Sequence, residues 1–131
     1  MIYLDSSAVV KLCRVEPQTA ALTGWLGSQS REVVRLSSAL ARIESARALL
    51  RVDPRSLANL PMVLAGMATM AIDEPVVVAA AAFTDPLLRS LDAIHLASAL
   101  RLAPEITAFV TYDKRLANAA QGFGLPVLTP E

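Results

Sequence analysis

The chain has very few of the residues that small metal- or disulfide-stabilised proteins depend on. It contains one cysteine, Cys13, and one histidine, His95, among 131 residues. A lone cysteine forms no internal disulfide, which fits a reducing compartment, and we expect a cytoplasmic protein. The same scarcity makes a zinc site of the usual cysteine and histidine ligands a poor interpretation of this sequence.

Net charge and long apolar runs are also absent. Twelve basic residues balance twelve acidic ones, so no overall field attracts nucleic acid, although a local basic patch remains open. The longest uncharged apolar stretch, residues 60–72, is too short to cross a bilayer and contains Pro61. No charged segment precedes an apolar one at the start of the chain. We therefore expect no membrane association.

An alternation of strands and helices accounts for most of the chain. With 54% hydrophobic residues, the 131 residues are long enough for one domain, residues 1–131, with a sizeable core. The first and fourth strands are nearly continuous apolar runs, which is typical of a parallel sheet covered on both faces. The sequence thus predicts an α/β fold with a parallel sheet of four to five strands flanked by helices. We expect strands at 1–5, 32–37, 68–73, 106–113 and 125–130, and helices at 6–14, 18–28, 37–52, 54–67, 74–84, 90–103 and 114–124.

Four acidic residues occupy unusual places in this pattern. "MIYLD" ends in Asp5 and "AFVTYD" ends in Asp113, and parallel strands bring both ends to one edge of the sheet. Glu44 and Asp92 lie in otherwise apolar helices. Each acid alone reads as a helix cap or a solvated side chain. Together they predict an oxygen-lined site for Mg²⁺ or Mn²⁺, a cation that polarises a phosphodiester and lowers the pKa of bound water.

The order of four short motifs adds a family resemblance. "YLDSSAVVKL", "ARIESARAL", "SLDAIHLASAL" and "FVTYDKRLANAA" with "GLPVLTP" follow one another at a spacing that resembles PIN-domain ribonucleases. Within that family the chain resembles the VapC toxins of type II toxin–antitoxin systems. The resemblance covers nearly the whole chain and implies a PIN-like three-layer sandwich, with acids gathered at the carboxyl ends of the strands.

The resemblance also implies roles for individual residues. Some relatives carry a further acid a few residues after the one that matches Asp113, whereas Asn118 stands in that stretch here. A second metal ion would therefore be weakly held or supplied with the substrate. His95 lies three residues after Asp92 on the same helical face, and we expect a hydrogen-bonded, partly buried histidine there. The implied metal ligands are Asp5, Glu44, Asp92 and Asp113, with Ser6 and Thr111 as assisting hydroxyls.

The function implied is that of a metal-dependent endoribonuclease toxin acting on structured RNA. Its cleavage sites would be single-stranded loops, for example in tRNA or ribosomal RNA. The implied partners are a small VapB-like antitoxin and a second copy of the chain. The apolar segments 57–70 and 74–83 suggest an interface as well. Candidate phosphate contacts near the strand ends are Arg14, Arg89, Lys114 and Arg115.

Two alternatives stay open at this point. A PIN-like module without catalysis would bind RNA or protein through the same fold. A phosphotransferase that forms an aspartyl-phosphate would also place an aspartate, here Asp5, at the end of its first strand. The phosphatase pattern needs a second aspartate two residues later, where Ser7 stands, and a receiver domain needs a lysine that closes a late strand, whereas Lys114 directly follows Asp113.

Overall fold

Five short parallel strands form the centre of the molecule. The computed structural model describes all 131 residues and arranges the strands in the order β3-β2-β1-β4-β5, with every neighbouring pair parallel. The predicted parallel sheet is confirmed, with five strands. Their bounds are β1 Ile2–Leu4, β2 Arg35–Ser38, β3 Ala68–Met70, β4 Ala108–Val110 and β5 Val127–Leu128.

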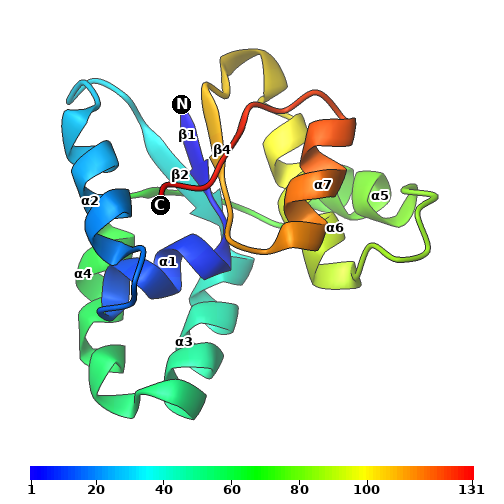
Figure 1. Ribbon diagram of the computed structural model, residues 1–131. Helices are drawn as coiled ribbons and strands as arrows, with labels where there is room; N and C mark the ends of the chain where they lie inside the picture. The colour runs from blue at the N-terminus through cyan, green and yellow to red at the C-terminus, as the bar shows by residue number, and fades with distance from the viewer.

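Helices cover both faces of this sheet. Helices α1 to α4 pack together on one side, and α5, α6 and α7 lie on the other, as Figure 1 shows. The bounds are α1 Ser6–Cys13, α2 Thr19–Ser28, α3 Leu40–Val52, α4 Leu60–Ala65, α5 Glu74–Ala81, α6 Ser90–Leu100 and α7 Lys114–Gly122, with 3₁₀ turns η1 Pro54–Asn59 and η2 Ala103–Glu105.

The alternation of side chains along β1 and β4 creates two separate cores. Ile2 and Leu4 pack toward α1 and α2, whereas Tyr3 between them packs toward α6 and α7. Phe109 of β4 stacks on Tyr3, with ring centroids 5.2 Å apart. Because a strand places successive side chains on opposite faces, two apolar faces need two helical layers. The result is the three-layer sandwich that the sequence predicted.

Aspartates start three of the helices. The side chains of Asp5, Asp73 and Asp113 accept hydrogen bonds from the backbone N–H groups in the first turns of α1, α5 and α7. The serines expected to begin α3 instead belong to β2, and the Ser38 hydroxyl accepts a weak bond from Leu40 N at 3.2 Å. Pro61 divides the segment 54–67 into η1 and α4, because proline fits the first turn of a helix but not its interior.

The strand order places the ends of β1 and β4 at the turning point of the sheet. From β1 the chain proceeds outward through β2 and β3, then crosses back to β4 on the other side of β1. Leu4 pairs with Val110 at the carboxyl ends of these two strands. Open α/β sheets leave a crevice at such a reversal, since the flanking connections leave in opposite directions. Asp5 and Asp113 follow these two strand ends.

The two most apolar helices are not buried as a whole. Helix α4 buries only Leu60 and helix α5 buries only Val76, so their remaining apolar side chains lie nearer the surface. This matches the expectation that segments 57–70 and 74–83 carry more apolar residues than the core uses. No helix of the structure has the length and apolar character needed to cross a membrane.

Candidate active site

Asp5 is the most deeply buried acid at the carboxyl edge of the sheet. Its side chain is 3% exposed, and both carboxylate oxygens accept hydrogen bonds. Oδ1 accepts from the Ser7 hydroxyl at 2.6 Å and from Ala8 N at 2.9 Å, and Oδ2 accepts from the Thr111 hydroxyl at 2.5 Å. Burial is the main cause that raises the pKa of Asp5 above its usual range, although these donors act in the opposite direction.

The first turns of α6 and α7 bring Asp92 and Asp113 close together. Asp113 Oδ1 accepts from Arg115 N at 2.8 Å and from Leu116 N at 3.0 Å, so this acid is held as a helix cap. Burial, followed by the negative charge of Asp113, raises the pKa of Asp92. The Oδ2 atom of Asp92 is buried and has no hydrogen-bond partner. An unpartnered buried carboxylate oxygen is unusual and needs a partner such as a water molecule or a metal ion.

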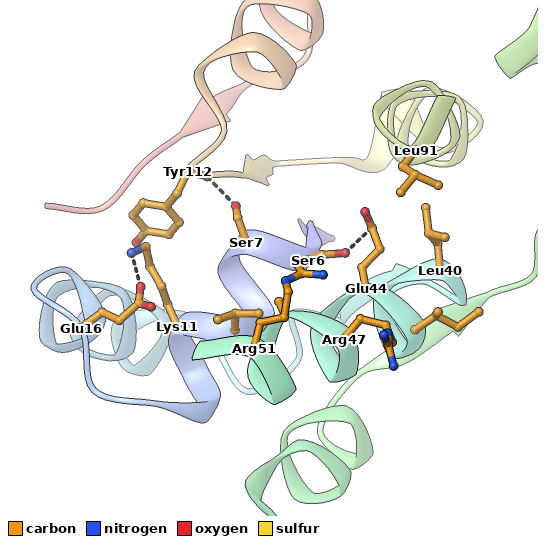
Figure 2. A pocket seen from close by; sticks show the side chains of 13 residues that line it. Ser6, Ser7, Lys11, Glu16, Leu40, Glu44, Arg47, Arg51, Leu91 and Tyr112 are labelled. Carbon is orange, nitrogen blue, oxygen red and sulfur yellow. Dashed lines mark hydrogen bonds and ion pairs between the residues drawn. The ribbon is translucent and has the colours of Figure 1, made fainter. Parts of the chain in front are cut away.

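Glu44 reaches the same edge from α3 and is held by side chains of two other elements, α1 and α6. Its Oε1 accepts from the Ser6 hydroxyl at 2.5 Å, a bond drawn in Figure 2, and lies 2.7 Å from His95 Nε2. His95 Nδ1 in turn lies 2.8 Å from the Tyr3 hydroxyl. Burial would raise the pKa of Glu44, but the hydrogen bonds from His95 and Ser6 outweigh it and lower the pKa. These contacts keep Glu44 ionised and fixed in orientation.

The predicted hydrogen-bonded histidine is therefore found, but it is more deeply buried than expected. His95 is 2% exposed and lies beside the candidate ligand Glu44. The role of Tyr3 was not predicted from the sequence, because its contact with His95 joins residues 92 positions apart. The sequence shows only that Tyr3 stands in the middle of the apolar first strand.

The four acids suit a divalent cation in their chemistry, although the structure does not hold them as a tight cage. Ser6 and Thr111 also lie in the site, each bonded to one of these acids. No three histidine, cysteine, aspartate or glutamate side chains converge closely enough to hold an ion. Carboxylate oxygens are nevertheless what Mg²⁺ and Mn²⁺ bind, and the unpartnered Oδ2 of Asp92 supplies a free donor. The four carboxylates therefore fit such a cation in their chemistry, and Asp5 and Asp113 would contribute oxygens from side chains that already accept hydrogen bonds.

The cations proposed from the sequence are distributed unevenly around this edge. Arg89 and Arg115 lie near enough to Asp92 to oppose the rise of its pKa. Lys114 lines a small hollow beside Asp113. Arg14 instead pairs with Glu16 at 3.2 Å, so its charge is partly neutralised. Two further cations, Arg47 and Arg51, which were not predicted as phosphate contacts, line a cavity of about 550 Å³ together with Glu44.

Known proteins with related sequences and structures are consistent with this geometry. The family model described as "PIN domain" matches residues 2–122. Ribonuclease VapC35 of Mycobacterium tuberculosis is 46% identical over 99% of this chain and 97% of its own length. A crystal structure of Mycobacterium tuberculosis VapC20, described as a sarcin–ricin-loop-cleaving toxin, has a TM-score of 0.75 at 14% identity and covers 91% of this chain and 95% of that one.

A second solved structure with the same fold contains a complex. It is VapBC2 from Rickettsia felis bound to a DNA fragment from its promoter, with a TM-score of 0.72 at 14% identity and complete coverage of both chains. At this identity the likeness concerns the fold alone. The family match and the 46% identity carry further, because both extend over nearly the full chain. The chain therefore belongs to the PIN-domain family and, within it, to the VapC ribonucleases.

Proposed function

We propose that the chain is a metal-dependent endoribonuclease that acts as the toxin of a toxin–antitoxin pair, with residues 1–131 forming a single PIN domain. Its metal, Mg²⁺ or Mn²⁺, would be held by Asp5, Glu44, Asp92 and Asp113. The observation that carries this proposal is the unpartnered, buried Oδ2 of Asp92 at the turning point of the sheet. Burial and the negative charge of Asp113 both disfavour the ionised form of the Asp92 carboxyl group, and a bound cation would compensate for both effects.

The side chains around the site would orient the substrate and the cation. A bound cation supplies positive charge at the phosphodiester and a more acidic water. Ser6 and His95 hold the Glu44 carboxylate in one orientation, while Ser7 and Thr111 hold that of Asp5. Arg89 and Arg115, near Asp92, and Lys114, near Asp113, would contact phosphate oxygens. Arg14 is the weakest of the predicted phosphate contacts because Glu16 already pairs with it.

The substrate and partners follow from the family and from the open site. Structured RNA such as tRNA or ribosomal RNA exposes bases and backbone in single-stranded loops, which a site at the edge of a sheet can reach. The VapBC2 complex supports a VapB-like antitoxin as partner. We further propose a homodimer and a cytoplasmic location, where such RNA is found.

The test compares RNA cleavage by the purified chain with Mn²⁺ and with EDTA. We expect labelled tRNA and ribosomal RNA fragments to be cut only with metal. We expect Asp92→Asn and Asp113→Asn to lower the cleavage rate by about 100-fold or more, since each removes a charged oxygen donor from the site. The control variant Glu32→Gln changes an exposed acid remote from the site and should cleave as the wild type does.

The same experiment separates the alternatives. A folded wild-type chain that binds RNA but never cuts it would indicate a silent binding module and overturn the proposal. An aspartyl-phosphate mechanism requires a nucleophilic Asp5 open to substrate. Asp5 is almost fully buried, and both of its oxygens accept hydrogen bonds, which argues against attack from this residue.

A further inference from the structure

A cavity of about 550 Å³ opens directly beside Glu44, between helices α1 and α3. Figure 2 shows Glu44, Arg47 and Arg51 extending from α3, with Ser6, Ser7 and Lys11 on α1 opposite them. The cavity is therefore continuous with the candidate active site. A substrate that reaches Glu44 can extend into it.

One face of α3 carries the charges that line this cavity. Glu44, Arg47 and Arg51 stand at positions i, i+3 and i+7, which a helix places in one stripe. Both arginines are exposed, and neither takes part in any ion pair or side-chain hydrogen bond of the structure. Their guanidinium groups are free to bind an anion from outside the chain.

The opposite wall adds no free negative charge to neutralise them. Lys11 Nζ pairs with Glu16 Oε2 at 2.6 Å, so these two lining residues cancel each other. Glu44 is already held by Ser6 and His95 and faces the site rather than the arginines' end of the stripe. The far part of the cavity is thus a positive region that leads away from an acidic centre.

The spacing of the two arginines suits a nucleic acid backbone. Four helical residues at about 1.5 Å each place Arg47 and Arg51 about 6 Å apart along α3, a separation comparable to that of successive phosphates in an extended strand. The other predicted cations, Arg89 and Arg115, lie in the opposite helical layer near Asp92. A strand crossing the acidic edge would therefore meet cations on both sides of the scissile phosphate.

We propose that Arg47 and Arg51 form a backbone-binding track for single-stranded RNA on one side of the scissile phosphate. The inference rests on the proposed ribonuclease function and assigns the path of the substrate through this site. The exposed aliphatic side chains of Ile43 and Leu91 line the same cavity and offer apolar surface against which unstacked bases can pack. The track binds phosphates, so it should contribute affinity that depends on salt but little on sequence.

The experiment measures binding of a fluorescent single-stranded RNA in EDTA, where no cleavage occurs, at several salt concentrations. For single strands each phosphate contact contributes about 0.7 to the slope of log association constant against log salt. The double variant R47Q/R51Q should therefore reduce the slope by about 1.4 and weaken binding about tenfold. With Mn²⁺ the same variant should raise KM and leave kcat nearly unchanged.

Two matched variants control for fold and charge. R42Q/R55Q removes two exposed arginines, one of them also on α3, that do not line the cavity, and it should leave the slope unchanged. R47K/R51K keeps both charges and should retain most of the slope. Circular dichroism confirms that each variant is folded.

Each remaining outcome is decisive. An unchanged slope in R47Q/R51Q would overturn the track even if the wild type cleaves RNA, and so would a wild type that binds no RNA at low salt. A variant that keeps its RNA slope but no longer binds a VapB-like peptide would assign the cavity to a protein partner instead. Absence of Mn²⁺-dependent cleavage in the wild type would count against the proposed function. The salt slopes of RNA binding are measured in EDTA, so they test the track independently of cleavage.

Discussion

At the scale of single residues, Tyr3 determines which ring nitrogen of His95 can donate a hydrogen bond to Glu44. Burial, aided by the charge of Asp5, raises the pKa of Tyr3, so its phenol stays protonated and has a hydrogen to donate. In the neutral imidazole ring, Nδ1 then accepts that hydrogen and Nε2 carries the ring proton. This tautomer lets Nε2–H donate to the Glu44 carboxylate at 2.7 Å. A buried tyrosine therefore supports a candidate metal ligand through an intermediate ring.

We predict that His95→Leu weakens Mn²⁺ binding by about 10- to 100-fold, the usual cost of losing a partner that orients a metal ligand. His95→Gln should restore part of the affinity, because its amide N–H can take the place of Nε2–H. Isothermal titration calorimetry without RNA measures the effect directly. Tyr3→Phe should lower the affinity by a smaller factor, since the ring loses only the bond that selects its tautomer.

Wild-type Mn²⁺ affinity in a folded His95→Leu variant would contradict this positioning role. It would mean that Glu44 binds no metal or that the Ser6 hydroxyl alone orients it. Thermal unfolding in EDTA serves as the control for packing, because removing a buried hydrogen bond also affects stability.

At the scale of the elements, the sequence was informative wherever one segment decides its own structure. Apolar runs predicted β1 and β4, and the aspartates after them lie at one edge of the sheet as expected, because strand ends in a parallel sheet share one side. The predicted start of α3 at Ser37 was wrong, because Ser37 and Ser38 belong to β2. There the Ser37 hydroxyl donates a hydrogen bond to the Leu4 carbonyl oxygen. Local capping preferences do not reveal that competing bond to a neighbouring strand.

Contacts between side chains of different helices and strands could not be predicted from the sequence pattern. The stripe of Glu44, Arg47 and Arg51 is visible in the spacing of α3, but its use depends on α1 packing beside it to form the cavity. The Tyr3–His95 pair likewise requires β1 to lie under α6. The four candidate metal ligands remain a prediction, although the structure brings Asp92 close to Asp113 and joins Glu44 to His95.

The meeting of the α6 and α7 N-termini leads to a prediction for stability. Asp92 carries an unpartnered buried oxygen beside Asp113, so its ionised form is unfavourable without metal. We predict that Asp92→Asn stabilises the metal-free protein at pH 7 by up to about 1 kcal/mol, a limit set by partial solvent screening. Thermal unfolding in EDTA measures this, and added Mn²⁺ should stabilise the wild type more than the variant.

The raised pKa of Asp92 also predicts how the stability of the metal-free protein changes with pH. A carboxyl group whose pKa is raised in the folded state favours folding while it is protonated, below its ordinary value of 3.8. The contribution is lost as the pH rises through the raised pKa, so metal-free wild type should lose more stability than Asp92→Asn over that range. A variant that unfolds at a lower temperature than wild type at pH 7 in EDTA would show that attraction of the Asp92 carboxylate to Arg89 and Arg115 outweighs its repulsion by Asp113.

At the scale of the whole molecule, the surface carries more apolar area than a small monomer needs to expose. The mean hydropathy is +0.47, yet only 32 of 131 residues are buried, so apolar side chains remain outside. Several gather around a hollow of about 430 Å³ between the end of α7 and the loop before α6. Phe83 and Phe123 pack edge to face there, 5.1 Å apart. An exposed apolar patch of this kind favours association.

We predict that the chain forms a homodimer through this patch, which consists of Phe83, Leu87, Leu88 and Phe123. Leu87 is 73% exposed and Phe123 is 55% exposed, so L87E/F123E should not disturb the core but should place charges in the interface and give a monomer. Size-exclusion chromatography with light scattering measures the mass at micromolar concentration. The control Val15→Glu, at a residue 90% exposed on the other helical layer, should remain dimeric. A monomeric wild type, or equal dissociation by both variants, would show that the patch does not mediate self-association and would leave it available to a different partner.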